Sequence, residues 1–134
     1  MPVFDRLYIQ FLYYFNEKRD YYECHEVMEE LWLEEGRSPL YQGLLQIAVG
    51  LYHFQGDNLG GAVKLMEAGL EKLSAYPHSC LGINLELLRV ESGNYLRKLK
   101  QYDEAPFSFY PIQVLIIDSE LERQVQMLKL AASE

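Results

Sequence analysis

Residues 38–58 read SPLYQGLLQIAVGLYHFQGDN, and this stretch carries the clearest helix signals in the chain. Serine followed by proline suits the N-cap and the first position of a helix, and Gly56-Asp57-Asn58 is typical of a tight turn. Between these two signals, apolar side chains cover more than half of the helix circumference. A stripe of this width predicts a central helix over residues 39–55 with neighbours on two sides.

Similar signals occur on both sides of this central segment. Asp20 with Glu23 three residues later forms a capping box, Asn58 can cap the helix after the turn, and Asp118-Ser119 caps the last helix. Apolar side chains follow these caps at three- and four-residue spacing. Five further helices are therefore predicted, over about residues 3–17, 20–35, 59–74, 84–100 and 119–132.

Two segments interrupt the helical pattern. Ser92-Gly93-Asn94 is a point at which the fifth helix can split in two. Pro106 and Pro111 bracket an irregular aromatic stretch, which either packs on the core or forms an exposed contact surface. The whole pattern predicts an all-α fold, a compact bundle of about five to six helices in orthogonal or antiparallel packing.

Length and composition point to one domain. The 134 residues, 49% of them hydrophobic, fall in the usual one-domain range and supply enough apolar material for a core. No linker or low-complexity tract divides the chain, so we expect a single all-helical domain over residues 1–134. Cys24 and Cys80 stand far apart outside any metal-binding spacing, so both are expected as reduced, mostly buried thiols.

The charge balance excludes two classes of partner. The net charge is −8, and the longest basic cluster is Arg97-Lys98 followed by Lys100. A nucleic-acid-binding protein needs a basic stripe that releases phosphate counterions, and anionic membranes repel an acidic surface. The first residues lack the pattern of a signal peptide, and no apolar run reaches about 18 residues. We therefore expect a cytoplasmic protein that binds neither nucleic acid nor membrane.

The second predicted helix carries a histidine and a carboxylate on one side. His25 and Glu29 are four residues apart, so their side chains are within reach of each other. Histidine and carboxylate at this spacing form either half of a metal site or an acid–base pair. His25 also lies next to Trp32 at the border of the apolar face. Partial burial beside a carboxylate tunes an imidazole near neutral pH.

A polar strip on the central helix offers a second half for such a site. Gln46 and His53 are two turns apart on this strip, with Gly50 between them. If the strip faces the second helix, then His25, Glu29, Gln46 and His53 line one small polar pocket. If it faces water, it is the solvated stripe of an amphipathic helix.

Two stretches resemble a known family. The first is Phe15-Asn16 followed by Asp20-Tyr21-Tyr22-Glu23-Cys24-His25-Glu26-Val27-Met28-Glu29-Glu30-Leu31-Trp32. The second runs from Tyr41 to His53 and continues in Asp57-Asn58 and Gly61-Ala62. Together with a looser match at Leu73, Tyr76-Pro77 and Gly82-Ile83, these stretches resemble the DUF309 family of small bacterial and archaeal proteins.

The resemblance implies a compact multi-helical fold and no particular activity. It covers a family-like core of about residues 15–100 and leaves residues 101–134 as a C-terminal extension. The candidate pocket residues, by resemblance together with geometry, are His25, Glu26, Glu29, Trp32, Gln46, His53 and Asn58. Cys24 stands where the family has a small residue, and we assign it no function.

Three functional hypotheses follow. The first is a non-enzymatic binding or scaffold domain, because no complete catalytic constellation is present and a helix hairpin suits recognition of a partner helix. Its partner would be another protein or a second copy of this chain. The second is a hydrolase-like enzyme that uses a divalent metal or acid–base chemistry, with His25, Glu29 and His53 as candidate ligands. The third is a purely structural polar cluster.

Overall fold

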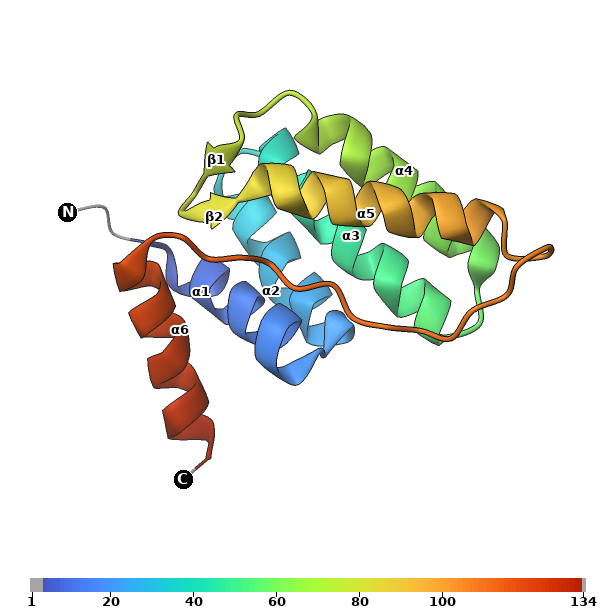
Figure 1. Cartoon of the computed structure of the whole chain (residues 1–134). Helices are drawn as coiled ribbons and strands as arrows, with labels where there is room; N and C mark the ends of the chain where they lie inside the picture. Colours follow the sequence, from blue (N-terminus) through green and yellow to red (C-terminus); the bar gives the residue numbers. More distant parts are fainter. Residues whose placement is uncertain (1–3, 134) are drawn as a thin grey trace.

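The computed structural model describes residues 4–133, and this part of the chain confirms the predicted all-α bundle (Figure 1). Six α-helices account for most of it: α1 (Arg6–Tyr13), α2 (Tyr21–Glu34), α3 (Pro39–Gln55), α4 (Leu59–Leu73), α5 (Leu85–Lys100) and α6 (Ser119–Ala132). The α3 helix packs on both α2 and α4, as its wide apolar stripe predicts.

Most of the predicted helix caps are confirmed. The side chains of Asp20, Asn58 and Asp118 each accept a backbone N–H in the first turn of α2, α4 and α6. Ser38 occupies the N-cap position of α3, but its side chain makes no capping hydrogen bond, so the proline at the first position carries the start signal. The α5 helix runs unbroken through residues 92–94.

Two local features differ from the sequence prediction. The first predicted helix ends in a π-helical turn, η1 (Tyr14–Lys18), which stops at Arg19 in the left-handed region with φ 54°. Between the predicted helices over residues 59–74 and 84–100, where no strand is predicted, the chain forms a small antiparallel hairpin of β1 (Ser79–Cys80) and β2 (Ile83–Asn84). Two-residue strands are too short to show a period of two in the sequence.

The contact between α3 and α4 depends on glycines. A Cβ atom added at Gly43 would lie 3.3 Å from the backbone oxygen of Gly69, and one added at Gly69 would lie 2.9 Å from that of Gly43. A Cβ atom added at Gly50 would likewise lie 3.3 Å from the backbone nitrogen of Met66. The two helix backbones therefore meet at a distance that larger side chains would not allow.

Residues 106–117, which we call the strap, run in extended form from the end of α5 across the helices to α6 (orange in Figure 1). Its aromatic half packs on the core, which answers the question that the sequence left open. Phe109 contacts the rings of Tyr21 and Phe54 at centroid distances of 5.9 and 6.3 Å. The Tyr95 hydroxyl on α5 donates to the carbonyl of Tyr110 at 2.9 Å.

The second half of the strap is held by one buried amide. Asn16, in η1, is 7% exposed. Its Nδ2 donates to the carbonyl of Val114 at 2.9 Å, and its Oδ1 accepts the N–H of Val114 at 2.8 Å. The side chain of Asn16 thus pairs with the strap as a neighbouring strand would.

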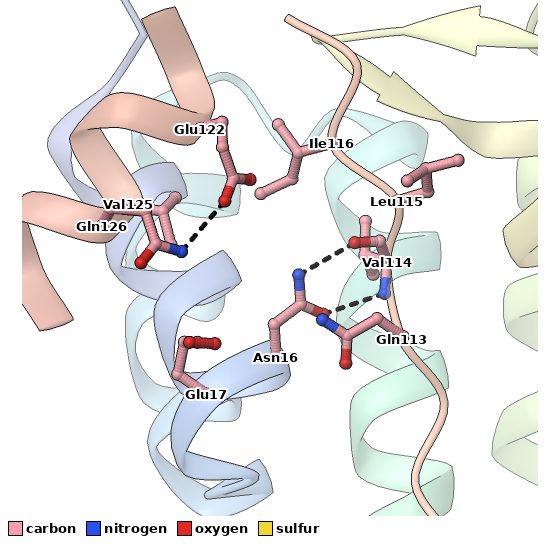
Figure 2. A pocket seen from close by; sticks show the side chains of 9 residues that line it. All are labelled: Asn16, Glu17, Gln113, Val114, Leu115, Ile116, Glu122, Val125 and Gln126. Carbon is pink, nitrogen blue, oxygen red and sulfur yellow. Dashed lines mark hydrogen bonds between the residues drawn. The ribbon is translucent and has the colours of Figure 1, made fainter. Parts of the chain in front are cut away.

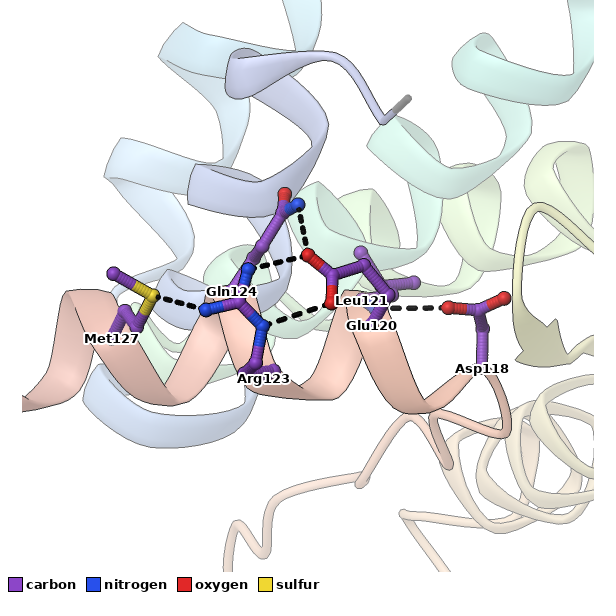
Figure 3. Close-up of polar contacts among 6 residues, drawn as sticks. All are labelled: Asp118, Glu120, Leu121, Arg123, Gln124 and Met127. Atoms are coloured by element: carbon purple, nitrogen blue, oxygen red, sulfur yellow. Dashed lines mark hydrogen bonds and ion pairs between the residues drawn. The ribbon is translucent and has the colours of Figure 1, made fainter. Parts of the chain in front are cut away.

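The α6 helix follows the strap and packs on α1 through buried Leu121 and Val125. On its outer side the Glu120 carboxylate accepts hydrogen bonds from Arg123 and Gln124 (Figure 3). These two donors lower the pKa of Glu120 from 4.5 to about 2. Because the pKa is lowered in the folded chain, this contribution to stability is present above pH 4.5 and is lost as the pH falls toward 2.

Both cysteines are free, as predicted, with Cys24 buried and Cys80 half-buried. Burial, followed by the charges of Asp20 and Glu23, raises the pKa of the Cys24 thiol, which removes it from consideration as a nucleophile. Within residues 4–133, no helix combines the length and the apolar character that crossing a bilayer requires.

Replacing Gly69 with alanine is expected to destabilise the bundle. The new methyl group would clash with the Gly43 carbonyl, so we expect a loss of about 1–2 kcal/mol in the free energy of unfolding, measured in urea. Gly93→Ala is the matched control, because no atom lies within 4 Å of a Cβ there. That substitution should raise stability by about 0.5–1 kcal/mol through helix propensity alone. Equal effects of the two substitutions would contradict the close helix contact.

Replacing Asn16 with alanine is expected to cost about 2–4 kcal/mol of unfolding free energy, because it leaves the buried N–H and C=O of Val114 unpaired. Asn94→Ala provides the control, since Asn94 is exposed on α5 and should change stability by no more than about 0.5 kcal/mol. A small loss for Asn16→Ala, comparable with the control, would mean that the strap does not depend on this amide.

Candidate functional site

The His25 imidazole lies against two carboxylates of its own helix. Its Nε2 is 2.9 Å from a carboxylate oxygen of Glu29, and its Nδ1 is 3.3 Å from one of Glu26. The predicted contact between residues four apart is therefore confirmed. The His25 side chain is 38% exposed, so this group faces solvent at the edge of α2.

Residues of the polar strip on α3 make polar contacts with residues on α4 and at its N-cap. Gln46 Oε1 accepts a hydrogen bond from Lys72 Nζ at 3.0 Å. His53 Nδ1 lies 3.5 Å from the amide nitrogen of Asn58, whose oxygen at the same time caps α4 through the N–H of Gly61. These contacts do not include His25 or Glu29. The structure therefore pairs the candidate residues in two separate groups.

Trp32, which belongs to the predicted apolar face of α2, is half-buried. Its indole N–H is buried without a hydrogen-bond partner among the described residues. The guanidinium carbon of Arg37 lies 5.5 Å from the centre of the indole ring, a cation–π distance. Arg37 follows the end of α2, so this contact fixes the loop that leads into α3.

Two exposed tyrosines connect the groups on α2 and α3. The rings of Tyr22 and Tyr52 lie 6.1 Å apart, and Tyr52 lies 6.0 Å from the His53 ring. Their exposed fractions are 52% and 44%. We call the surface formed by Tyr22, His25, Glu26, Glu29, Tyr52 and His53 the α2–α3 face.

Neither Tyr22 nor Tyr52 is among the candidate pocket residues that the sequence indicates. The missed signal is that Tyr22 follows a buried position on α2 by one residue, which points it about 100° away from the core.

A shallow pocket of about 440 Å³ lies beside Tyr52. The residues that line this hollow are Tyr52, His53, Gln55, Gly56 and Asn58.

The described residues do not assemble a metal site. Between Phe4 and Ser133, no three His, Cys, Asp or Glu side chains come together in a group that could hold a metal ion. The candidate set of His25, Glu29 and His53 is thus not brought together. Two members of it are close together, because His25 Nε2 lies 2.9 Å from a carboxylate oxygen of Glu29, within the reach that an acid–base pair requires.

Comparisons with known proteins confirm the family resemblance. Residues 8–65 match the family described as "Domain of unknown function (DUF309)". The chain is 40% identical over 76 residues to the "Uncharacterized protein YpuF" of Bacillus subtilis (strain 168), an alignment that covers 54% of this chain and 44% of that protein. It is 30% identical over 73 residues to an "Uncharacterized protein" of Aquifex aeolicus (strain VF5), covering 52% and 22%.

The chain spans less than half the length of either of these relatives. No solved structure matches it. The matched residues 8–65 include α2, α3 and the α2–α3 face, while the strap and α6 lie outside them.

Replacing His25 with glutamine is expected to change the free energy of unfolding by less than about 1 kcal/mol, because the imidazole pairs with exposed carboxylates in high dielectric. Urea denaturation measures this directly. A loss of several kcal/mol, the scale for a buried polar network, would show that His25 has a structural role. The tolerated substitution would leave His25 free for a contact outside the chain.

Proposed function

Residues 8–65 of this chain belong to the DUF309 family, and from this premise we propose that the chain is a non-catalytic binding module whose partner docks on the α2–α3 face. Of the other candidate residues, Asn58 borders this face through its contact with His53. Trp32 and Gln46 instead contact Arg37 and Lys72, which are not part of this face. The partner we propose is a segment of another protein that carries basic and apolar side chains.

The observation that carries this proposal is the exposed contact between Tyr22 and Tyr52. Two large rings at a helix–helix border, each about half exposed, leave apolar surface in water that a partner would cover. Tyrosine is enriched at the energetic centres of protein interfaces, because it offers a large rigid surface with a polar end. Both rings sit on helices, which hold them in place before a partner arrives.

Charge supports a basic partner. Glu26, Glu29 and Glu30 lie on the same side of α2 as Tyr22 or next to it, in a chain with a net charge of −8. Lysine or arginine side chains can pair with these carboxylates and stack on tyrosine rings. A second copy of this chain would bring like charges together on this face, and nucleic acid would meet the same repulsion.

One observation favours a second candidate function. The distance of 2.9 Å between His25 Nε2 and the Glu29 carboxylate suits a general base held by an orienting carboxylate. An acid–base enzyme would need this pair to meet a substrate on the same face. The two proposals therefore share a location and differ in which residues matter.

The binding proposal is tested by photo-crosslinking in cells. A photoreactive phenylalanine analogue at position 22 should capture one protein reproducibly, whereas the same analogue at position 90 should not. Val90 is the matched control position, because it is 53% exposed on α5, away from the α2–α3 face. The captured protein is then purified, and its affinity for the intact chain is measured by calorimetry.

Tyr52→Ala should weaken that affinity about 30-fold, the effect of an interface hot spot of 2 kcal/mol. Val90→Ala should leave it unchanged, and both variants should melt close to the original chain. Equal capture at positions 22 and 90, or unchanged affinity in Tyr52→Ala, would contradict the proposal. Turnover of a metabolite that is lost in Glu29→Gln but kept in Tyr52→Ala would favour the enzyme instead.

A further inference from the structure

The end of the strap lies beside the small hairpin and pairs with it at one isolated bridge. The N–H of Asn84 donates to the carbonyl of Leu115, and the N–H of Ile117 donates to the carbonyl of Gly82, each at 2.8 Å. These two bonds flank an antiparallel bridge between Ile83 and Ile116. The strap thus pairs with the edge of β2 at this one position.

This bonding pattern fixes the direction of the Ile116 backbone. In an antiparallel pair whose bonds are made by the flanking residues, the N–H and C=O of the central residue point to the opposite edge of the strand. Val114, two residues earlier, presents the same edge, and Asn16 occupies it with two hydrogen bonds. The N–H and C=O of Ile116 have no hydrogen-bond partner within residues 4–133.

A cleft of about 320 Å³ lies along this open edge, between η1, the strap and α6 (Figure 2). Its volume is at the lower end of the range for ligand sites. The residues that line it are Asn16, Glu17, Gln113, Val114, Leu115, Ile116, Glu122, Val125 and Gln126. Figure 2 shows the Asn16 amide directed at the Val114 backbone, with the Glu17 and Glu122 side chains on the facing wall.

We propose that this cleft binds an extended peptide segment of another protein, which pairs with the open edge at Ile116. One residue of the peptide would exchange two hydrogen bonds with the Ile116 N–H and C=O, the mode called β-augmentation. Asn16 ends the paired stretch at Val114, so the site accepts a short segment. The Ile116 N–H donor and C=O acceptor point to the same edge. A peptide backbone can bond to both groups, whereas a simple ion can bond to only one of them.

The carboxylates of the cleft define the side chain that this peptide carries. Glu122 accepts a hydrogen bond from Gln126 at 2.9 Å, and Glu17 pairs with Lys129 at 2.9 Å. The Lys129 contact shows that a carboxylate of this cleft already pairs with a cationic side chain. A lysine or arginine of the peptide would pair with Glu122, which has no cationic partner among the described residues.

The probe is the peptide acetyl-Val-Lys-Val-Lys-Val-amide, titrated into the isotope-labelled intact chain and followed by NMR. The amide signal of Ile116 should move in a saturable way, because its N–H gains a hydrogen bond. The matched control peptide carries a methyl group on the backbone nitrogen of the central valine, which removes one donor and blocks the edge. It should bind about tenfold more weakly or not at all.

Two variants test whether the peptide binds at the edge formed by Ile116. Ile116→Pro removes the open N–H and should abolish binding, while Ile116→Val keeps the N–H and should bind as the original chain does. Should Ile116→Pro fail to fold, Glu122→Gln gives the second test, because Glu122 is half-buried on α6 and glutamine keeps its size without its charge. This substitution should weaken binding about threefold to tenfold, the effect of a partly exposed charge pair.

The inference would be overturned by no shift of Ile116 at millimolar peptide, by equal binding of the methylated peptide, or by equal binding by Ile116→Pro. Shifts confined to Tyr22 and Tyr52 would also overturn it, while supporting the α2–α3 face as the place where basic segments dock. The Ile116 signal reports on the cleft, and the Tyr22 and Tyr52 signals report on the α2–α3 face. Either proposal can therefore fail while the other holds.

Discussion

Two hydrogen bonds between the Asn16 side chain and the Val114 backbone determine where the last quarter of the chain lies. They join residues 98 positions apart in the sequence, inside the core, where an unpaired amide would be costly. With Val114 fixed, the strap meets β2 in a single register, and α6 begins where it can pack on α1 (Figure 1). The cleft beside the strap and the open backbone of Ile116 are consequences of the same two hydrogen bonds.

Sequence reasoning predicts the helices well, because their signals are local. The caps at Asp20, Asn58 and Asp118 and the wide stripe of α3 each depend on residues within a few turns. The π-helical turn at Tyr14–Lys18 and the hairpin at residues 79–84 are not predictable in this way. The turn contains Asn16, whose partner Val114 lies far along the chain, and a side-chain amide that replaces a strand leaves no periodic pattern. The strands of the hairpin are only two residues long, which is too short to show a period of two.

The candidate site is predictable only in part, for a related reason. Spacing along one helix correctly pairs His25 with Glu29. The placement of Gln46 and His53 depends on which neighbour their strip of α3 approaches, and the glycines Gly43 and Gly69 bring α4 to that side. The exposed Tyr22–Tyr52 contact arises between helices, so neither helical wheel alone indicates it. The sequence supplies the chemistry of this surface, and tertiary packing decides which groups meet.

Native-state hydrogen exchange tests the hydrogen bonds between Asn16 and Val114 most directly, because it reports on the Val114 and Ile116 amides in one experiment. The account predicts that the Val114 amide exchanges only through global unfolding, whereas the Ile116 amide, two residues away, exchanges rapidly in the free chain. Exchange of Val114 at the rate of Ile116 would show that Asn16 does not hold the strap, and the cleft beside it would lose its basis.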